Sequence, residues 1–273
     1  MILQVSSVAN KFDLLLRAFE KRYAPKIANA LRNQLRRVAA TLPLGVEYTR
    51  RRVQSTGIGQ QMTDAIKGMH KDVGKFMAGY TLRGLQKHPV KKKGRVFRFS
   101  ETWTRQIQEY FNLHLLESVD SINETTKNHI LVVLNQGTKE GWSTERMVRE
   151  INSKVYIGNR TERIVRTESV RAANFGVTLG ADSYDYETVK EWNSVNDNRT
   201  RHSHRNVDGQ TREHGETFSN GLQFPGDPEG PASEVVNCRC AMAIVPKRDA
   251  NGRLIPKKRR LPPVGARQIV EAA

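Results

Sequence analysis

The residues of this chain with the clearest capacity for chemistry are two cysteines near its C-terminal end. Cys238 and Cys240 are its only cysteines, a single residue separates them, and several histidines lie shortly before them. Zinc is bound by thiolate and imidazole ligands in a tetrahedral set. His204, Cys238 and Cys240 are therefore candidate zinc ligands. A fourth ligand would come from one of three further residues: His202, His214 or Asp208.

The tight spacing of the two cysteines keeps a second interpretation open. Zinc-binding cysteines are usually separated by about two to four residues. In the alternative, His204 hydrogen-bonds a turn and both cysteines pack as small apolar side chains. A disulfide across one residue would be strained, which argues against a secreted, disulfide-stabilised domain and favours a reducing, cytosolic environment. The sequence indicates no cofactor other than zinc.

Glu168 is the second candidate, because it lies on the apolar side of a predicted helix, between Ile164 and Ala172. A buried carboxylate needs a partner that offsets its lost hydration. Arginines that could provide a bidentate partner follow in a turn-rich segment: Arg199, Arg201, Arg205 and Arg239. We expect a structural ion pair, with Glu168, Arg199 and Arg239 as its candidates. In the alternative, Glu168 is a catalytic carboxylate that acts with His204 and Asp208 in a metal-dependent nuclease.

The charge of the chain points to a polyanionic partner. It has 45 Lys and Arg against 28 Asp and Glu, a net charge of +17, and nucleic acid is the first candidate. Basic clusters in loops and tails can follow a phosphate backbone without a preformed groove, although ordinary solvated charge is the alternative. The DNA-binding residues predicted on this basis are Arg50, Arg51, Arg52, Lys91, Lys92, Lys93, Arg95, Lys257, Lys258, Arg259 and Arg260.

Apolar residues at spacings of three and four predict a mainly helical N-terminal region. Helices are expected over residues 11–40, with a break at Pro25, and over 63–85, 101–119, 122–134 and 160–180. Residues 41–59 and 83–98 contain proline, glycine and clustered basic residues, so the first is predicted as a loop and the second as a loop or short hairpin. Ser143 is the predicted N-cap of a short helix.

The pattern changes after Ala181. Residues 188–195 alternate and predict a strand, residues 196–230 are rich in turns, and a short helix over 232–236 precedes a last strand over 241–245. The sequence thus predicts an α+β fold. It comprises a helical, basic region 1–155, a small α+β domain 156–246 with a short sheet, and a basic disordered tail 247–273. No apolar run is long enough to span a membrane, and no secretory signal is recognised.

A series of short motifs follows between residues 160 and 246. They are Arg166-Thr167-Glu168, Lys190-Glu191-Trp192, Asp197-Asn198-Arg199-Thr200-Arg201, Ser203-His204-Arg205, Asp208-Gly209, Phe224-Pro225-Gly226-Asp227-Pro228 and Asn237-Cys238-Arg239-Cys240. In order, spacing and closing motif, this segment resembles the phage Mu protein F-like domain of phage minor head proteins, the head-morphogenesis family. The resemblance covers about a third of the chain.

The resemblance implies a minor capsid protein of a tailed bacteriophage, without enzymatic activity, that acts in head assembly, DNA packaging or ejection. The implied partners are the portal protein, double-stranded DNA and a scaffolding or major capsid protein, and no membrane. The implied location is the virion, in the capsid interior near the portal, with the host cytoplasm as the place of assembly. A metal-dependent nuclease remains the alternative function. A third interpretation, an RNA-associated protein, lacks the aromatic and glycine patterns of RNA-binding modules.

Overall fold

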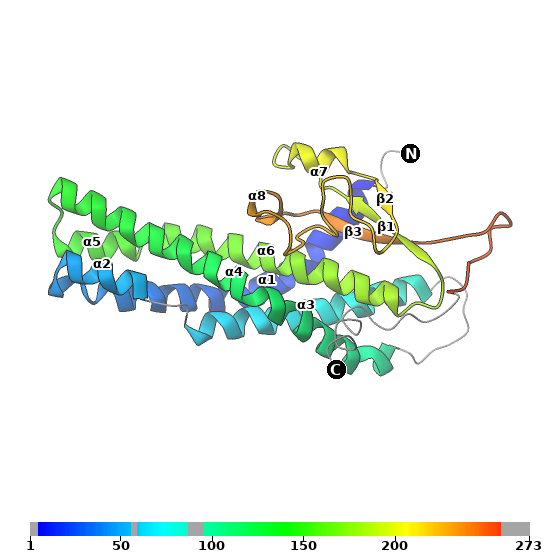
Figure 1. The fold of residues 1–273 in the computed structure, drawn as a ribbon, viewed down its shortest axis with the longest axis horizontal. Helices are drawn as coiled ribbons and strands as arrows, with labels where there is room; N and C mark the ends of the chain where they lie inside the picture. The colour runs from blue at the N-terminus through cyan, green and yellow to red at the C-terminus, as the bar shows by residue number, and fades with distance from the viewer. Residues whose placement is uncertain (1–4, 56–58, 87–95, 258–273) are drawn as a thin grey trace, which may run out of the picture. The chain divides into compact units, whose positions relative to one another are not determined.

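The computed structural model describes residues 5–55, 59–86 and 96–257, and most of them are helical (Figure 1). The helices are α1 (Val5–Ala39), α2 (Val46–Ser55), α3 (Gln60–Gln86), α4 (Val96–Glu140), α5 (Thr144–Ile151), α6 (Lys154–Asp182), α7 (His202–Asn206) and α8 (Ala232–Val235), with a 3-10 turn η1 at Leu42–Leu44. The strands are β1 (Thr188–Asn193), β2 (Thr211–Arg212) and β3 (Ala241–Pro246). The predicted α+β class, with helices first and a short sheet near the C-terminal end, is confirmed.

The chain divides into two compact units, and each unit combines segments from before and after residue 155. Unit 1 comprises Met1–Phe19, Gly68–Leu113 and Arg166–Ala273, and unit 2 comprises Glu20–Lys67 and His114–Val165. The division points fall within α1, α3, α4 and α6. Each unit is therefore held together by side chains that are far apart in the sequence.

Unit 2 has an aliphatic core to which five helices contribute. Leu35 from α1, Val53 from α2 and Ile151 from α5 are fully buried in it, together with residues of α4 and α6. Apolar residues recur at helical spacing along each of these segments, so each helix presents one apolar face to the core. Ser143 caps α5 as predicted, because its side chain accepts a hydrogen bond from the backbone N–H of Arg146.

Unit 1 is organised around the later half of α6. A Cβ atom added at Gly176 of α6 would overlap the backbone of Gly74 in α3, so the two helices touch at these glycines. On α4, Tyr110 stacks on Phe175 with ring centroids 3.9 Å apart, and Phe111 meets Phe175 edge-on at 5.5 Å. The helix α6 is thus the shared packing partner of α3 and α4 within this unit.

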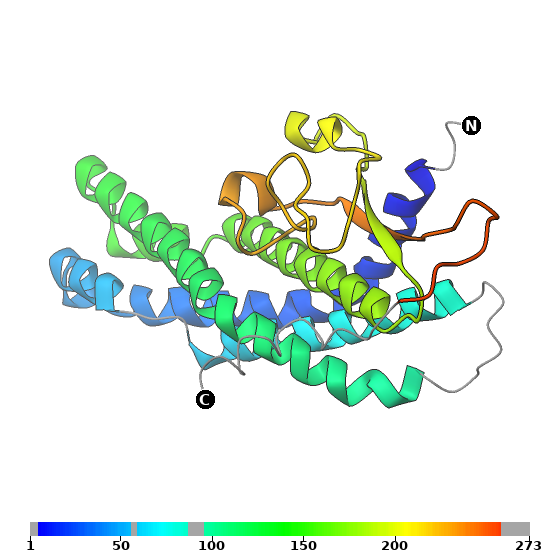
Figure 2. The ribbon, with the colours of Figure 1, turned by 45° about the vertical axis from the view of Figure 1, so that its right-hand side comes forward.

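The sheet of unit 1 has the order β2-β1-β3, and both pairs are antiparallel. In the central strand β1, Trp192 is fully buried and pairs with Met242 of β3. Asn174 of α6 fixes the sheet to the helix, because its Oδ1 accepts a hydrogen bond from the backbone N–H of Met242 at 2.8 Å. Figures 1 and 2 show the sheet beside α6 in both views.

Three details of the sequence prediction are wrong. Residues 46–55, predicted as part of a loop, form α2, because Thr49 and Val53 lie four residues apart on a fully buried helix face. The helix α1 continues through Pro25, whose ring is exposed, since the buried Tyr23 and Ile27 hold the chain on both sides. Residues 101–134 lie in the single helix α4, because no glycine or proline interrupts them.

Residues 247–257, which the sequence assigns to the tail, are folded back onto unit 1. The backbone N–H of Lys247 donates to the carbonyl oxygen of Glu187 at 2.8 Å, and Arg248 pairs with Leu254 across a turn. Figure 2 shows this segment extending beyond β3 and returning toward the end of α6. Residues 258–273 lie outside the described part of the chain. Among the helices described, none combines the length and apolar composition that crossing a membrane requires.

Candidate functional site

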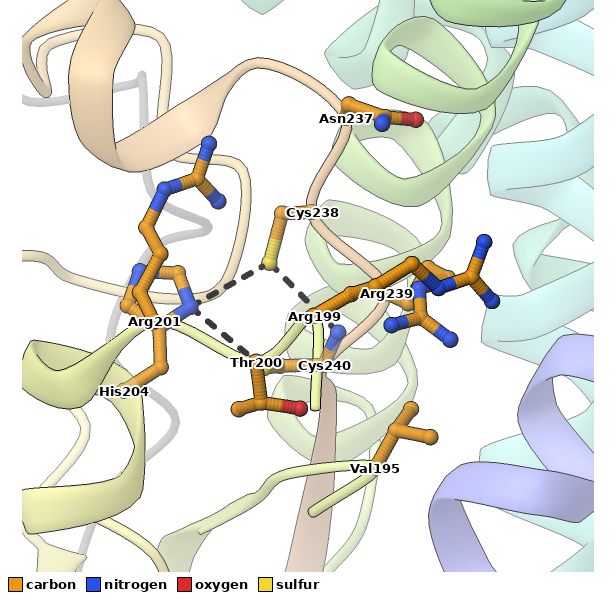
Figure 3. Close-up of a pocket in the computed structure, with 9 residues that line it drawn as sticks. All are labelled: Val195, Arg199, Thr200, Arg201, His204, Asn237, Cys238, Arg239 and Cys240. Carbon is orange, nitrogen blue, oxygen red and sulfur yellow. Dashed lines mark hydrogen bonds between the residues drawn. The ribbon is translucent and has the colours of Figure 1, made fainter. Parts of the chain in front are cut away.

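Three predicted metal ligands, His204, Cys238 and Cys240, converge in unit 1 (Figure 3). The Nδ1 atom of His204 lies 3.6 Å from the Sγ atom of Cys238 and 3.4 Å from that of Cys240. All three ligand atoms lie within 4.8 Å of one another, and all three residues are buried. We call these residues the Cys-His cluster. It brings together side chains from α7 and from the segment between α8 and β3.

Local backbone geometry directs both thiols toward the same imidazole nitrogen. After α8 the chain turns at Asn237, whose φ of 59° is in the left-handed region that asparagine tolerates better than most residues. The backbone N–H of Asn237 donates to Thr167 Oγ1 at 2.9 Å, which attaches this turn to α6. The backbone N–H of Cys240 then donates to Cys238 Sγ at 3.4 Å. The Asn-Cys-Arg-Cys sequence is therefore a turn that places two sulfur atoms on one side.

The two thiols of the cluster differ in acidity. The Cys238 thiol, and to a lesser extent His204 and Ser194, lower the pKa of Cys240 below its ordinary value although burial opposes this. The pKa of Cys238 is raised, because its thiol shares a hydrogen bond with the Cys240 side chain and because burial disfavours the thiolate. The first proton of the pair is thus lost more readily than the second. The thiolate is the form of cysteine that binds a metal or acts as a nucleophile.

The other imidazole nitrogen of His204 faces a carboxylate that the sequence did not single out. Its Nε2 atom lies 3.1 Å from Glu234 Oε2, an ion-pair distance that is off the line of an ideal hydrogen bond. Glu234 Oε2 also accepts a hydrogen bond from Ser203 Oγ at 2.7 Å, and the Trp192 ring packs edge-on against the imidazole at 5.0 Å. A carboxylate beside Nε2 favours the proton on that nitrogen, which leaves the Nδ1 lone pair directed at the sulfurs.

A small pocket opens beside the cluster, and arginines form much of its wall. Its lining residues are Val195, Arg199, Thr200, Arg201, His204, Asn237, Cys238, Arg239 and Cys240 (Figure 3). Arg201 Nη2 donates to the carbonyl oxygen of Val236 at 2.6 Å. Arg239 Nη2 lies 2.7 Å from Asp197 Oδ1, and this guanidinium holds the pKa of Asp197 well below its usual range. Arg201 and Arg239 are thus each anchored beside the cluster, the first by a carbonyl oxygen and the second by a carboxylate that balances its charge.

The three residues considered as a fourth ligand lie elsewhere. His202 Nδ1 is 3.2 Å from Asn206 Nδ2. His214 Nε2 is 2.6 Å from Thr188 Oγ1, and Asp208 Oδ1 accepts a hydrogen bond from the backbone N–H of Ser194 at 2.7 Å. Within the described ranges, the group of candidate metal ligands that includes His204 consists of this histidine, Cys238 and Cys240.

Glu168 is buried and ion-paired, but its partners are not the predicted arginines. Its Oε2 lies 2.8 Å from His70 Nε2 on α3, and its Oε1 lies 3.2 Å from Arg171 Nη1 on α6. Arg199 and Arg239 instead contact Asp197. Burial alone would raise the pKa of Glu168, but Arg171 and His70 outweigh it, so the pKa is lowered. The partners follow from packing, because Arg171 is one turn along α6 and α3 touches this helix.

The predicted DNA-binding residues lie in different settings. Arg51 and Arg52 are exposed on α2, whereas Arg50 is half-buried and lies 3.1 Å from Glu47. Lys257 Nζ donates to two carbonyl oxygens at the end of α6, at 3.0 and 3.2 Å, so its charge is used within unit 1. The other predicted residues lie outside the described part of the chain: Lys91, Lys92, Lys93, Arg95, Lys258, Arg259 and Arg260.

The positive charge of unit 2 comes from one of its two segments. Residues 20–67 contain ten basic and three acidic residues, whereas residues 114–165 contain seven of each. Many of the basic side chains in the first segment are exposed on α1 and α2: Lys21, Arg22, Lys26, Arg32, Arg36, Arg51 and Arg52. In unit 2 the exposed positive charge therefore lies largely on helix faces, whereas the DNA-binding residues predicted from the sequence were assigned to loops and the tail.

Part of this chain is similar to a known protein family. Residues 128–243 match the family model described as Phage Mu protein F like protein. The match begins within α4 and ends within β3, so it includes α5, α6, Glu168 and the Cys-His cluster. It begins 38 residues before Arg166, where the first motif that carries the sequence resemblance starts. No curated protein and no solved structure matches the chain.

Proposed function

Because residues 128–243 match the phage Mu protein F-like family, we propose that the protein acts in bacteriophage head morphogenesis. It is a minor capsid protein that associates with the portal inside the procapsid and binds DNA without sequence preference. The family match is the observation that carries the role in the head. Portal, scaffolding or major capsid proteins are the partners that such a role requires.

The charge distribution supports the DNA-binding part of the proposal. The net charge is +17, and in unit 2 the excess lies in residues 20–67. Arg51 and Arg52 are exposed neighbours on α2, so both can reach phosphate oxygens. Contacts of this kind neutralise the DNA backbone and carry no base-specific information.

The nuclease alternative depends on His204, Asp208 and Glu168 acting on one metal ion. Glu168 is instead enclosed by His70 and Arg171, and Asp208 receives the backbone N–H of Ser194. In the described part of the chain, the metal-ligand group that contains His204 includes neither carboxylate. Metal-dependent nucleases need carboxylates that converge on the metal. A plasmid-nicking assay with Mg²⁺ or Mn²⁺ tests this alternative directly, and we expect no nicking.

A salt titration tests the DNA-binding proposal. Fluorescence anisotropy with two unrelated duplexes should give equal affinities that fall steeply with salt, because binding releases counterions. The double variant Arg51→Gln/Arg52→Gln should reduce the slope of log K against log salt by about 2, since each phosphate contact contributes about 0.9. The matched control is Arg146→Gln/Arg149→Gln, which removes two exposed arginines of α5 in the charge-balanced segment. Affinity that is independent of salt would exclude the proposed mode of binding.

The head-assembly role is tested in particles. Procapsids and virions of the phage that encodes this chain should contain it in a few copies, and detergent-released portal rings should retain it. Quantitative mass spectrometry of purified particles measures both. Absence of the protein from procapsids and from virions would overturn the assignment to the head, whatever its affinity for DNA.

A further inference from the structure

The spacing of the Cys-His cluster matches a coordination sphere. With Zn–S distances of about 2.3 Å and Zn–N distances of about 2.0–2.1 Å at tetrahedral angles, a nitrogen and a sulfur ligand lie about 3.6 Å apart. The two distances from His204 Nδ1 to the sulfurs are 3.6 and 3.4 Å. A single ion can therefore contact all three atoms with little movement of the side chains.

The surroundings of His204 are those of a metal-binding imidazole. Glu234 lies 3.1 Å from Nε2, on the side of the ring opposite the sulfurs. Histidines that bind metals usually donate this second N–H to a carboxylate or carbonyl group, which fixes the ring and makes the coordinating nitrogen more basic. Glu234 can occupy that second position but cannot reach an ion on the Nδ1 side while it contacts Nε2.

The two sulfur atoms are also suited to bind a cation. The backbone N–H of Cys240 donates to Cys238 Sγ, a contact that a metal-bound sulfur would retain. Two thiolates neutralise a divalent ion, so the interior would carry no net charge from the metal and these two ligands. Thiolate and imidazole ligands together select zinc over calcium or magnesium, which prefer oxygen ligands.

We propose that His204, Cys238 and Cys240 bind one zinc ion in unit 1, with Glu234 as the positioning residue for His204. The fourth coordination position opens to the arginine-lined pocket and is filled by solvent. This ion ties α7 to the turn that precedes β3. The proposal concerns the fold of this domain and holds whether or not the protein binds DNA.

Metal analysis of the full chain, purified without a histidine tag or chelator, tests the proposal. We expect about one zinc per chain, as three protein ligands and one ion imply. Substitution of Co²⁺ should give the near-ultraviolet band of thiolate-to-cobalt charge transfer. Removal of zinc by a chelator should lower the melting temperature, and added Zn²⁺ should restore it.

Variants separate the ligands from their neighbours. Cys240→Ser should abolish stoichiometric zinc, whereas His202→Asn, which removes an exposed histidine of the same helix, should retain it. Glu234→Gln should bind zinc with about 10- to 100-fold lower affinity, as expected when the carboxylate that orients a metal-binding histidine is replaced. Since Cys240→Ser could misfold, the wild-type chain decides the outcome. Wild-type protein without stoichiometric zinc, unable to take up Zn²⁺ or Co²⁺ with both thiols reduced, would overturn the proposal.

Discussion

Replacing Glu168 with glutamine tests whether unit 1 depends on one buried negative charge. The side chains of His70, Glu168 and Arg171 are 3%, 4% and 7% exposed. Glutamine has nearly the same size but cannot carry the charge that balances Arg171. It also turns an N–H group toward one of the two donors that now face the carboxylate. The substitution therefore changes charge and hydrogen bonding while packing is conserved.

The expected loss of stability can be bounded from these contacts. Breaking a buried ion pair by removing one partner costs about 3–5 kcal/mol. The glutamine oxygen can still accept one hydrogen bond, and Arg171 Nε keeps its bond to the carbonyl oxygen of Gly226 at 3.1 Å. We therefore expect the lower end, a loss of about 3 kcal/mol in the free energy of unfolding. The same change at Glu101, which is exposed on α4 in the same unit, should cost less than about 0.5 kcal/mol.

Tryptophan fluorescence during urea denaturation can isolate the effect in unit 1. Trp103 and Trp192 lie in unit 1 and are buried, whereas Trp142 lies in unit 2. In a Trp142→Phe background, the fluorescence change therefore reports on unit 1 alone. If Glu168→Gln and Glu101→Gln unfold at the same urea concentration with the same slope, the charge of Glu168 contributes nothing and the reasoning is refuted.

Two further predictions concern acid sensitivity and helix packing. Burial first, and then the neighbouring Lys257 and Lys190, lower the pKa of His214 from 6.5 to about 4. The unfolded chain thus binds more protons between these values, and stability is lost as pH falls through this window, by about 1.4 kcal/mol per pKa unit. His214→Gln should flatten this part of the stability profile, measured by thermal unfolding across the window, and an unchanged profile would contradict it. At Gly176, an added Cβ would lie 3.0 Å from Gly74 Cα and nearer still to the Gly74 carbonyl oxygen. The cost of overpacking, about 1–3 kcal/mol, should exceed the gain in helix propensity, which is about 1 kcal/mol. Gly176→Ala should therefore be destabilising. Gly158→Ala is the control, because open space surrounds this position on the same helix, and it should be neutral or stabilising. Equal melting temperatures for the two variants would rule out the close contact at Gly176.

The elements of the fold could be predicted where one face of a segment is apolar. The helices around residues 63–85 and 160–180 and both longer strands follow from their spacing and appear as α3, α6, β1 and β3. The helix α2 was missed because the glycines and the three arginines of residues 41–59 are typical of a loop. Its signal was the pair Thr49 and Val53, four residues apart and both fully buried, but so short a face is visible only once the core is known.

The candidate site could be predicted in part, for a related reason. Residue types alone suggested His204, Cys238 and Cys240, because few side chains can hold zinc. Glu234 could not be predicted, since a single glutamate in a turn-rich segment belongs to no recognisable motif. Its contact with His204 depends on how α8 packs against α7. The partner of Glu168 was also beyond reach, because His70 lies 98 residues away on another helix.

A stripe of polar residues on α6 explains how the site is held in place. Glu168, Arg171 and Asn174 are buried and three residues apart, so they share one face of the helix. Glu168 contacts His70 of α3, and Arg171 donates a hydrogen bond to the carbonyl oxygen of Gly226. The Nδ2 atom of Asn174 donates to the carbonyl oxygens of Pro225 and Cys240 at 2.9 and 3.4 Å. Apolar contacts are non-directional, so an apolar face would fix the position of the turn-rich segment and the sheet along the helix by shape alone. Buried polar groups each need a partner, since an unpaired buried polar group is costly. The three contacts are therefore satisfied together in one register only. That register determines where Cys240 lies relative to His204.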